Sequence, residues 1–500
     1  MPAIPLPPYA PDVASTDAAV SGVALNVLPR ADGYGPVLAP VPTSLPLPED
    51  CRGAVAVVSP AYGTWSYFAG TRTALYRYNN STKGWDSVGN PGRSYSVPDG
   101  DSWQWALYGF RLIAVHLGAP PQSLDVDPQS GRADRSRRFS DLGGGPPHAR
   151  AVGIVGEFLV LAGLSIQPNA IWWSDLGNPE FWTRGKRNDG HQADWQVIPD
   201  GGAVTGFAGG EFGVVFQERS IRRLTFNPGS PQVFDFGLVE DNRGAVAPWA
   251  ICKVGPRTFF LDRDGFYLFT GAASQPIGAE RVNRTFLSAV DPLRLPQTIA
   301  VRDVYGPRVI FAYRTKAADP GRRALLDAAL VYDWQLDRWS ALSLAVTAGM
   351  ATATPPTSLD TLPGTLESQT LSFDDASYRG GIPALGFFTD DNRLSLLTGP
   401  PLEATIETAD AMLARPNRAF ARGIRLDSDA DDWRAQVGTR ETLRRADPFA
   451  WRPETAPTYS RFAPCRASGR YHRIRARIPA GTPWSYASGF EVDATAEGMR

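Results

Sequence analysis

The residues of this 500-residue chain that could hold a metal are its four histidines and three cysteines. The histidines are His116, His148, His191 and His472. No two of them have the HxH or HExxH spacing that binds zinc. The cysteines are odd in number and far apart, which favours reduced core residues over a disulfide framework; they are Cys51, Cys252 and Cys465. We therefore expect no metal site and no cofactor.

Neighbouring carboxylates are a second candidate, because a glycosidase needs two of them flanking a sugar. The candidates are Asp125 with Asp127, Asp374 with Asp375, Asp390 with Asp391, and the group Asp427, Asp429, Asp431 and Asp432. All stand among turn residues, and Asp supports turns through its own side chain. The run from Ser174 to Trp182 is similar to the Asp-box turn of sialidases, although Ser174 and Asp175 are adjacent where that pattern separates them. We expect structural roles for all of these residues, no catalytic residue and no enzyme activity.

Two groups of arginines form a third candidate. Arg132, Arg135, Arg137 and Arg138 lie in a polar loop, and Arg473, Arg475 and Arg477 alternate with His472, Ile474, Ala476 and Ile478. The alternation predicts a strand with guanidinium groups on one face and an apolar stripe on the other. Such a face can be merely solvated, can pair with acidic surface of a neighbouring subunit, or can contact nucleic-acid phosphate. Base-stacking aromatics are not interleaved, which counts against single-strand binding. The seven arginines are candidate subunit-interface or channel residues.

The composition narrows the function classes. The formal net charge of −1 gives no general argument for binding to nucleic acid or to an acidic membrane. The N-terminus lacks the cationic region of a secretion signal, and the longest apolar stretch, Ile154 to Ile166, is interrupted by Glu157. We expect a soluble chain without membrane insertion, made and assembled in a host cytoplasm.

A repeat organises the middle of the chain. A glycine precedes an apolar, strand-like run at intervals of between 45 and 54 residues, at Gly63, Gly109, Gly156, Gly210, Gly255 and Gly306. A period of this length with about four strands is the signature of a β-propeller. One twisted sheet of four strands cannot cover its own apolar faces, so such sheets pack as blades around an axis, and closure of the ring hides their edges.

The predicted fold is therefore all-β, with three parts. Residues 1–50 are an extended N-terminal segment that packs on the C-terminal β-domain, residues 51–400 are a β-propeller of about six four-stranded blades, and residues 401–500 are a small β-domain. The stretch from Leu371 to Leu397 is a seventh, irregular blade or a set of exit strands. A short helix is expected within Gly278 to Leu287. The tryptophans that end outer strands, at Trp85, Trp182 and Trp339, are expected to act as wedges between blades.

Several stretches resemble a known family. They are Ile171 to Trp182, Gly206 to Phe226, Arg243 to Pro248 leading into Phe259 to Tyr267, Leu330 to Trp339, and Leu397 to Thr405. Together they resemble the tail hub or nozzle proteins of short-tailed bacteriophages, including the packaged-DNA stabilisation proteins. The likeness covers most of residues 20–500 and contains no catalytic signature.

The resemblance implies a structural virion protein of the tail. Such a protein forms a homo-oligomeric ring, a hexamer, below the portal and adaptor proteins, and it meets tail fibre or needle proteins. It forms part of the DNA exit channel, contacts the packaged double-stranded DNA without sequence specificity and helps to retain that DNA until ejection. The alternative is a carbohydrate-active or carbohydrate-binding propeller, a glycosidase or a lectin, that acts on a cell-surface glycan.

Overall fold

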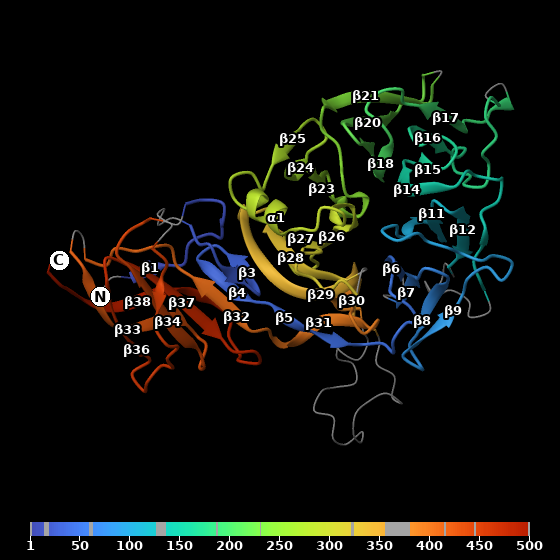
Figure 1. Cartoon of the computed structure of the whole chain (residues 1–500). Coiled ribbons are helices and arrows are strands. Elements are labelled where there is room, and N and C mark those ends of the chain that lie inside the picture. The colour runs from blue at the N-terminus through green and yellow to red at the C-terminus, as the bar shows by residue number, and fades with distance from the viewer. Residues whose placement is uncertain are drawn as a thin grey trace.

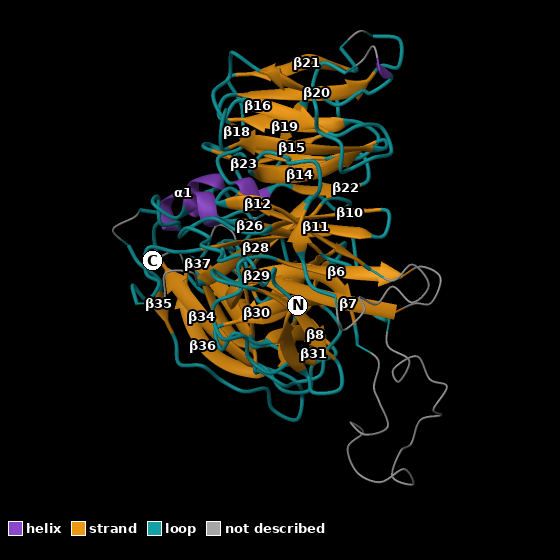
Figure 2. Ribbon diagram, turned by 90° about the vertical axis from the view of Figure 1, so that its right-hand side faces the viewer, coloured by secondary structure: helices purple, strands orange, loops and turns teal. Residues whose placement is uncertain are grey.

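The computed structural model describes residues 3–14, 20–59, 64–126, 137–186, 189–230, 232–321, 325–355, 381–414, 417–444 and 447–498. Strands dominate it, and the helical elements include α1 (Asn283–Ala289) and the 3-10 turns η2 (Pro248–Ala250) and η3 (Leu295–Gln297) (Figure 2). The α1 helix overlaps the stretch Gly278 to Leu287, where a short helix is expected, and extends to Ala289. No helix in these ranges is long and apolar enough to cross a membrane.

Five antiparallel sheets of four strands follow one another along the chain and form five blades (Figure 1). Blade 1 contains β6 (Ala54–Ser59), β7 (Thr64–Gly70), β8 (Leu75–Asn79) and β9 (Gly84–Ser87). Blade 2 contains β10 (Gln104–Tyr108), β11 (Arg111–His116), β12 (Ala119–Asp125) and β13 (Ser140–Asp141). Blade 3 contains β14 (Ala149–Val155), β15 (Phe158–Leu164), β16 (Ala170–Trp173) and β17 (Asp194–Val197). Blade 4 contains β18 (Val204–Ala208), β19 (Gly213–Gln217), β20 (Ser220–Phe226) and β21 (Phe234–Asp241). Blade 5 contains β22 (Cys252–Val254), β23 (Arg257–Asp262), β24 (Gly265–Phe269) and β25 (Ser274–Pro276).

The sixth and seventh blades share one long strand. Blade 6 contains β26 (Ile299–Arg302), β27 (Arg308–Tyr313), β28 (Leu326–Asp333) and the first half of β29 (Arg338–Ala353). The second half of β29 pairs with β30 (Pro383–Thr389), which pairs with β31 (Leu394–Pro401). The pairing register of β29 shifts between Val346 and Ala348, where its partner changes from β28 to β30. Such an irregularity bends a strand, so β29 can end one blade and begin the next.

A strand from the N-terminal segment completes the seventh blade. β5 (Leu38–Pro42) pairs with β31 as the fourth strand of that sheet. The second half of β29 lies against β26 on one side and β6 on the other, which closes the ring. The structure therefore confirms the propeller and gives it a seventh blade, whose outermost strand comes from residues far away in the sequence.

The glycine marker of the repeat corresponds to one turn that recurs in the blades. Gly109, Gly156 and Gly255 each open a two-residue loop between the innermost strand and the second strand of a blade. Their φ angles lie between 57° and 59°. A hairpin turn with glycine at its first central position needs this left-handed backbone, which other residues rarely adopt. Gly210 and Gly306 lie in the corresponding, longer loops, and Gly63 lies outside the described residues.

All three tryptophans lie between neighbouring blades, as expected. The buried Trp339 of blade 6 contacts Phe266 of blade 5 and donates from Nε1 to the carbonyl of Ile277 at 3.0 Å. Trp85 of blade 1 contacts Phe388 of blade 7. Trp182 is buried in the core that blades 2 and 3 share.

The C-terminal strands form two further layers that share one core. The first layer contains β38 (Ala487–Ala496), β33 (Ala419–Ser428) and β36 (Ala463–Gly469). The second contains β32 (Ala404–Glu407), β37 (Tyr471–Ile478), β34 (Arg434–Arg440) and β35 (Ala450–Trp451). Ile424 and Phe490 of the first layer and Val437 and Ile474 of the second belong to one buried cluster.

The N-terminal segment pairs with both C-terminal layers before it reaches the propeller. β1 (Ala3–Pro5) pairs with β38, and β3 (Val27–Arg30) pairs with β4 (Gly33–Pro36), which also reaches β38. β2 (Ala24–Leu25) pairs with β32 on one side and with β29 on the other. Blade 6 is thus joined through β2 to the second layer in one continuous sheet (Figure 1). The domain boundaries at residues 50 and 400 stay a prediction.

The first prediction concerns this segment. Deleting residues 1–42 removes β1 to β5, so we expect the amides of β31 and β38 to exchange hydrogen much faster, because each strand loses a bonded neighbour. The matched control deletes only residues 1–5, which should expose β38 and leave β31 protected. Hydrogen exchange followed by mass spectrometry measures both. Unchanged protection of β31 after the longer deletion would contradict the pairing of β5 with β31.

Candidate functional site

The three arginines of the C-terminal cluster lie on β37, in the middle of the second layer. Burial alternates along this strand, with His472, Ile474, Ala476 and Ile478 directed into the core. Arg473, Arg475 and Arg477 lie on the opposite face. The alternation in the sequence therefore corresponds to two faces of one strand.

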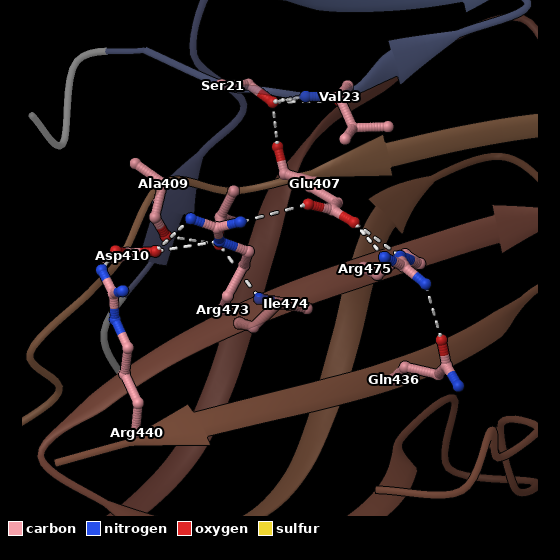
Figure 3. A network of polar contacts seen from close by, with 11 residues as sticks. Ser21, Val23, Glu407, Ala409, Asp410, Gln436, Arg440, Arg473, Ile474 and Arg475 are labelled. Atoms are coloured by element: carbon pink, nitrogen blue, oxygen red, sulfur yellow. Dashed lines mark hydrogen bonds and ion pairs between the residues drawn. The ribbon is translucent and has the colours of Figure 1, made fainter. Parts of the chain in front are cut away.

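Two buried carboxylates lie beside these arginines (Figure 3). Glu407, at the end of β32, has a side chain that is 3% exposed, and the side chain of Asp410 is 0% exposed. Arg473 Nη2 lies 2.7 Å from Asp410 Oδ1, and Arg475 Nη2 lies 2.5 Å from Glu407 Oε1. Arg440 of β34 also pairs with Asp410. A buried carboxylate is tolerated only with such partners, because it has lost its hydration.

Two aromatic rings lie close to the guanidinium groups. The guanidinium carbons of Arg440 and Arg473 lie 4.6 Å and 4.5 Å from the ring centre of Phe449, and that of Arg475 lies 4.3 Å from the ring centre of Trp451. A cation over an aromatic face is attracted by the negative face of the ring's quadrupole. These arginines therefore contact both a carboxylate and an aromatic ring.

Arg477 lies further out and has its own two partners. Its Nη1 is 2.9 Å from Glu403 Oε2 and its Nη2 is 2.6 Å from Glu454 Oε2. Hydrogen bonds to Glu454 and Glu403 raise the pKa of Arg477, and the hydrogen bond from Arg477 lowers the pKa of Glu454. All three arginines of β37 are therefore paired within the chain. Their role at a subunit contact or in a channel stays a prediction. In such a contact, the partner would bind guanidinium groups that already pair with carboxylates of this chain.

The network also holds the N-terminal segment. The buried Ser21 donates from Oγ to the backbone carbonyl of Glu407 at 2.6 Å, and the Glu407 amide donates to the carbonyl of Val23 at 3.0 Å (Figure 3). The residue that pairs with Arg475 through its side chain thus anchors the segment through its backbone.

Sequence reasoning did not single out Glu407 or Asp410. The alternation of Ala404 and Ile406 with Thr405 and Glu407 indicates that Glu407 faces away from the core. That signal does not identify the strand paired with β32. Only the register, in which Glu407 lies opposite Arg475, reveals the pair.

Arg137 and Arg138 of the other cluster lie near the junction of blades 2 and 3, and Arg132 and Arg135 lie outside the described residues. Arg138 Nη1 donates to the carbonyl of Ser87 in blade 1 at 2.9 Å. Arg137 and Arg138 line a cavity of about 320 Å³ together with Arg111, Asp125 and Glu180. Arg111 pairs with both carboxylates, with 2.7 Å from its Nε to Asp125 Oδ1. Arg137 and Arg138, the described members of this cluster, therefore lie apart from the arginines of β37.

The other carboxylate candidates that the structure describes bind neighbouring groups. Asp391 accepts from Thr389 Oγ1 at 2.7 Å, and Asp429 accepts from the Ser485 amide at 2.8 Å. Asp427 accepts from Ser488, Asp431 pairs with Arg461, and Asp432 pairs with Arg434. Asp127, Asp374 and Asp375 lie outside the described residues. Within the described ranges, no three His, Cys, Asp or Glu side chains gather as ligands for a metal.

Asp175, in the turn similar to an Asp box, organises the long loop of blade 3. Its Oδ2 lies 2.6 Å from His191 Nδ1, and its Oδ1 accepts from the Gln192 amide at 2.6 Å. His191 stacks on Phe181 with ring centres 3.9 Å apart. Burial alone would raise the pKa of Asp175, but these hydrogen bonds outweigh it and hold the pKa below the ordinary 3.8.

The second prediction tests the buried pair. Replacing Asp410 with Ala leaves Arg440 and Arg473 without their shared carboxylate, so we expect the free energy of unfolding to fall by about 3–5 kcal/mol. In the control, Asp431→Ala removes a carboxylate that is 94% exposed, and we expect a change below about 1 kcal/mol. Urea denaturation measures both variants. Equal, small losses would show that the buried network contributes little.

The third prediction concerns pH. Because folding lowers the pKa of Asp175, its contribution to stability is complete above pH 3.8 and is lost as the pH falls through the lower pKa of the folded state. We expect Asp175→Asn to lower stability at pH 7 by about 1–3 kcal/mol. The difference from the unchanged protein should shrink below pH 3.8. The control, Asp189→Asn, alters a carboxylate of the same loop that is 60% exposed and should have little effect. A difference that stays constant down to pH 3 would contradict this role.

Comparison with protein-family models and with curated protein sequences finds no match. Among solved structures, the chain is similar to PorZ, a bacterial surface component of the type-IX secretion system of Porphyromonas gingivalis. That likeness has 11% identity over 78% of this chain and a TM-score of 0.34, and it spans only 44% of PorZ. The chain is also similar to Hsv2 of Kluyveromyces lactis, with 11% sequence identity and a TM-score of 0.33. That likeness covers 73% of this chain and 95% of the Hsv2 chain. A third similar structure is a protein of unknown function from Desulfotomaculum acetoxidans, with 10% sequence identity and a TM-score of 0.34. That likeness covers 58% of this chain and 84% of the other chain. Likenesses this weak support no inference about function.

Proposed function

We propose that this chain is a structural subunit of the tail of a short-tailed bacteriophage, a hub or nozzle protein. In this proposal six copies form a ring below the portal and adaptor, line part of the DNA exit channel and help to retain packaged DNA. The observation that carries it is that the charged residues available for chemistry in the C-terminal layers are used to join separate parts of the chain. Glu407 binds Arg475 of the neighbouring strand and holds the N-terminal segment.

The stretches that resemble the hub family support the proposal through their positions. The stretch Ile171 to Trp182 contains tryptophans that fasten the long loop of blade 3, with Trp172 Nε1 3.2 Å from the carbonyl of Trp182 and Trp173 Nε1 2.9 Å from that of Gln192. The stretch Leu397 to Thr405 is where the chain leaves blade 7 and enters the C-terminal layers. Both stretches connect structural elements, and neither contains a catalytic signature. Their positions therefore agree with a structural role.

Ring formation needs two different surfaces of the same subunit. In a cyclic assembly one face of each copy meets a different face of the next, and the rotation closes the ring. A propeller that shares a continuous sheet with the C-terminal layers offers two such surfaces on one chain (Figure 1). Contact with DNA in the channel would be electrostatic and would weaken as the salt concentration rises.

The fourth prediction tests this role. We expect the purified chain, mixed with the portal and adaptor proteins of its own phage, to form one six-fold ring below the adaptor, visible in negative-stain images and as one added mass in mass photometry. The chain alone is the control, because the adaptor can be needed to template the ring. A chain that remains monomeric beside assembled portal–adaptor complexes at micromolar concentration would contradict the proposal.

A further inference from the structure

A cavity of about 390 Å³ opens at the centre of one face of the propeller. Much of its lining comes from segments near the innermost strands of five blades, with Arg52 before β6, Asp101 before β10, Trp249 before β22, Gln297 before β26 and Thr347 within β29. Gly321, Leu325 and Leu326, before and at the start of β28, also line it. Segments from blades on both sides of the ring can meet only near its axis. A cavity of this size lies in the range of ordinary small-molecule sites.

Trp249 of η2 is the aromatic group of this cavity. It is half-buried, and its Nε1 donates to the carbonyl of Gly100 at 3.2 Å, which joins the turn before blade 5 to the loop before blade 2. The same side chain lines an adjoining cavity of about 240 Å³ that also contains Asp101 and Arg150. An indole ring thus lies where the two cavities meet.

The polar groups around Trp249 are incompletely paired. The carboxylate of Asp101 is 11% exposed, burial raises its pKa, and its ion-pair contact with Arg150 Nε is long, at 4.0 Å. The Nε atoms of Arg52 and Arg150 are buried and lack a hydrogen-bond partner. Both atoms are covered by surrounding protein, so these two side chains shape the cavity, and contacts to a ligand come from other groups.

Two further donors at this cavity are available to a ligand. The side chains of Arg294 and Gln297 line it, and neither has a hydrogen bond or ion pair with any residue that the structure describes. Gln297 Nε2 lies so close to Gly100 that a Cβ at that glycine would be only 2.8 Å away. Gly100 has a φ of 85°, so this position suits glycine for both reasons.

The carboxylate, guanidinium, amide and indole groups that line the cavity favour some classes of ligand over others. An apolar ligand would cover the carboxylate of Asp101, which has a 3.2 Å hydrogen bond from the Ser102 amide and only a long contact with Arg150, and would offer no partner to the side chains of Arg294 and Gln297. A phosphate would meet the carboxylates of Asp99 and Asp101, which repel it. A hydroxyl group both donates and accepts, so it can satisfy carboxylate, guanidinium and amide together, and the apolar face of a sugar ring packs on an indole.

We propose that this axial cavity binds a short neutral saccharide. Trp249 provides the stacking surface, Asp101 accepts from sugar hydroxyl groups, and Arg294 and Gln297 donate to them. The inference goes beyond the ring-forming role and does not depend on it, because the cavity is formed by one chain. In a tail subunit, such a site would contact a glycan of the cell surface.

The fifth prediction tests this site on the purified full-length chain. The probes are methyl α-D-glucopyranoside, methyl α-D-mannopyranoside, methyl α-D-galactopyranoside and N-acetyl-D-glucosamine, followed by saturation-transfer NMR. We expect saturable binding of at least one probe with a dissociation constant of about 1 mM or below. Gln297→Ala and Arg294→Met should each weaken that binding about tenfold or more.

The matched control is Gln196→Ala, which removes an exposed amide on the outermost strand of blade 3 that donates to the adjacent carbonyl of Val197. This variant should bind the probe as the unchanged protein does, and all variants should unfold at the same temperature. Absence of saturable binding of all four probes up to about 50 mM would overturn the proposal. Equal weakening by Gln196→Ala and Gln297→Ala would overturn it as well. Neither outcome depends on whether rings form with the portal and adaptor.

Discussion

Backbone pairing by the N-terminal segment is the interaction on which the rest of this structure depends. The segment pairs with strands at three places, in blade 7, between β29 and β32, and at β38. Asn26 lies at the middle of it, with a φ of 57° that asparagine tolerates better than most residues. Its backbone amide donates to the carbonyl of Ala341 at 2.7 Å, and its side chain binds the carbonyl of Glu403 and the amide of Ser343. One residue therefore holds the propeller to the C-terminal layers.

Side-chain packing reinforces the same junction. A single buried cluster contains Phe259 and Trp339 of the propeller, Tyr34 of the N-terminal segment, and Trp433 and Phe490 of the C-terminal layers. Tyr34 also donates from its hydroxyl to the carbonyl of Pro7 at 2.8 Å. Since apolar area removed from water stabilises by roughly 25 cal/mol per Å², a core that spans the junction opposes any separation of the two bodies. The buried carboxylates of Glu407 and Asp410 lie beside this junction and hold the strand to which the segment binds.

The sequence predicted the repeating part of the fold because its signals are local. A glycine that must adopt a positive φ in a two-residue turn, as at Gly109 or Gly156, is visible wherever the turn recurs. The fourth strand of blade 7 could not be predicted, because β5 pairs with a strand about 350 residues further along and contains prolines that weaken its strand signal. The carboxylate partners of Arg473 and Arg475 could not be predicted either, because they are set by the pairing register of strands that are distant in the sequence. The axial cavity is assembled from loops of several blades, and no short stretch of sequence contains more than a part of it.

The central claim is that the propeller and the C-terminal layers form one rigid body, held by residues 3–42. Pulsed electron resonance between two spin labels measures this most directly. The labels would replace Leu293 on the propeller and Tyr459 on the C-terminal layers, which are 87% and fully exposed, with Cys465→Ser to leave only the buried Cys51 and Cys252. We expect one narrow distribution of distances between the labels. A broad or two-peaked distribution in the intact chain would show that the two bodies move independently and would contradict the claim.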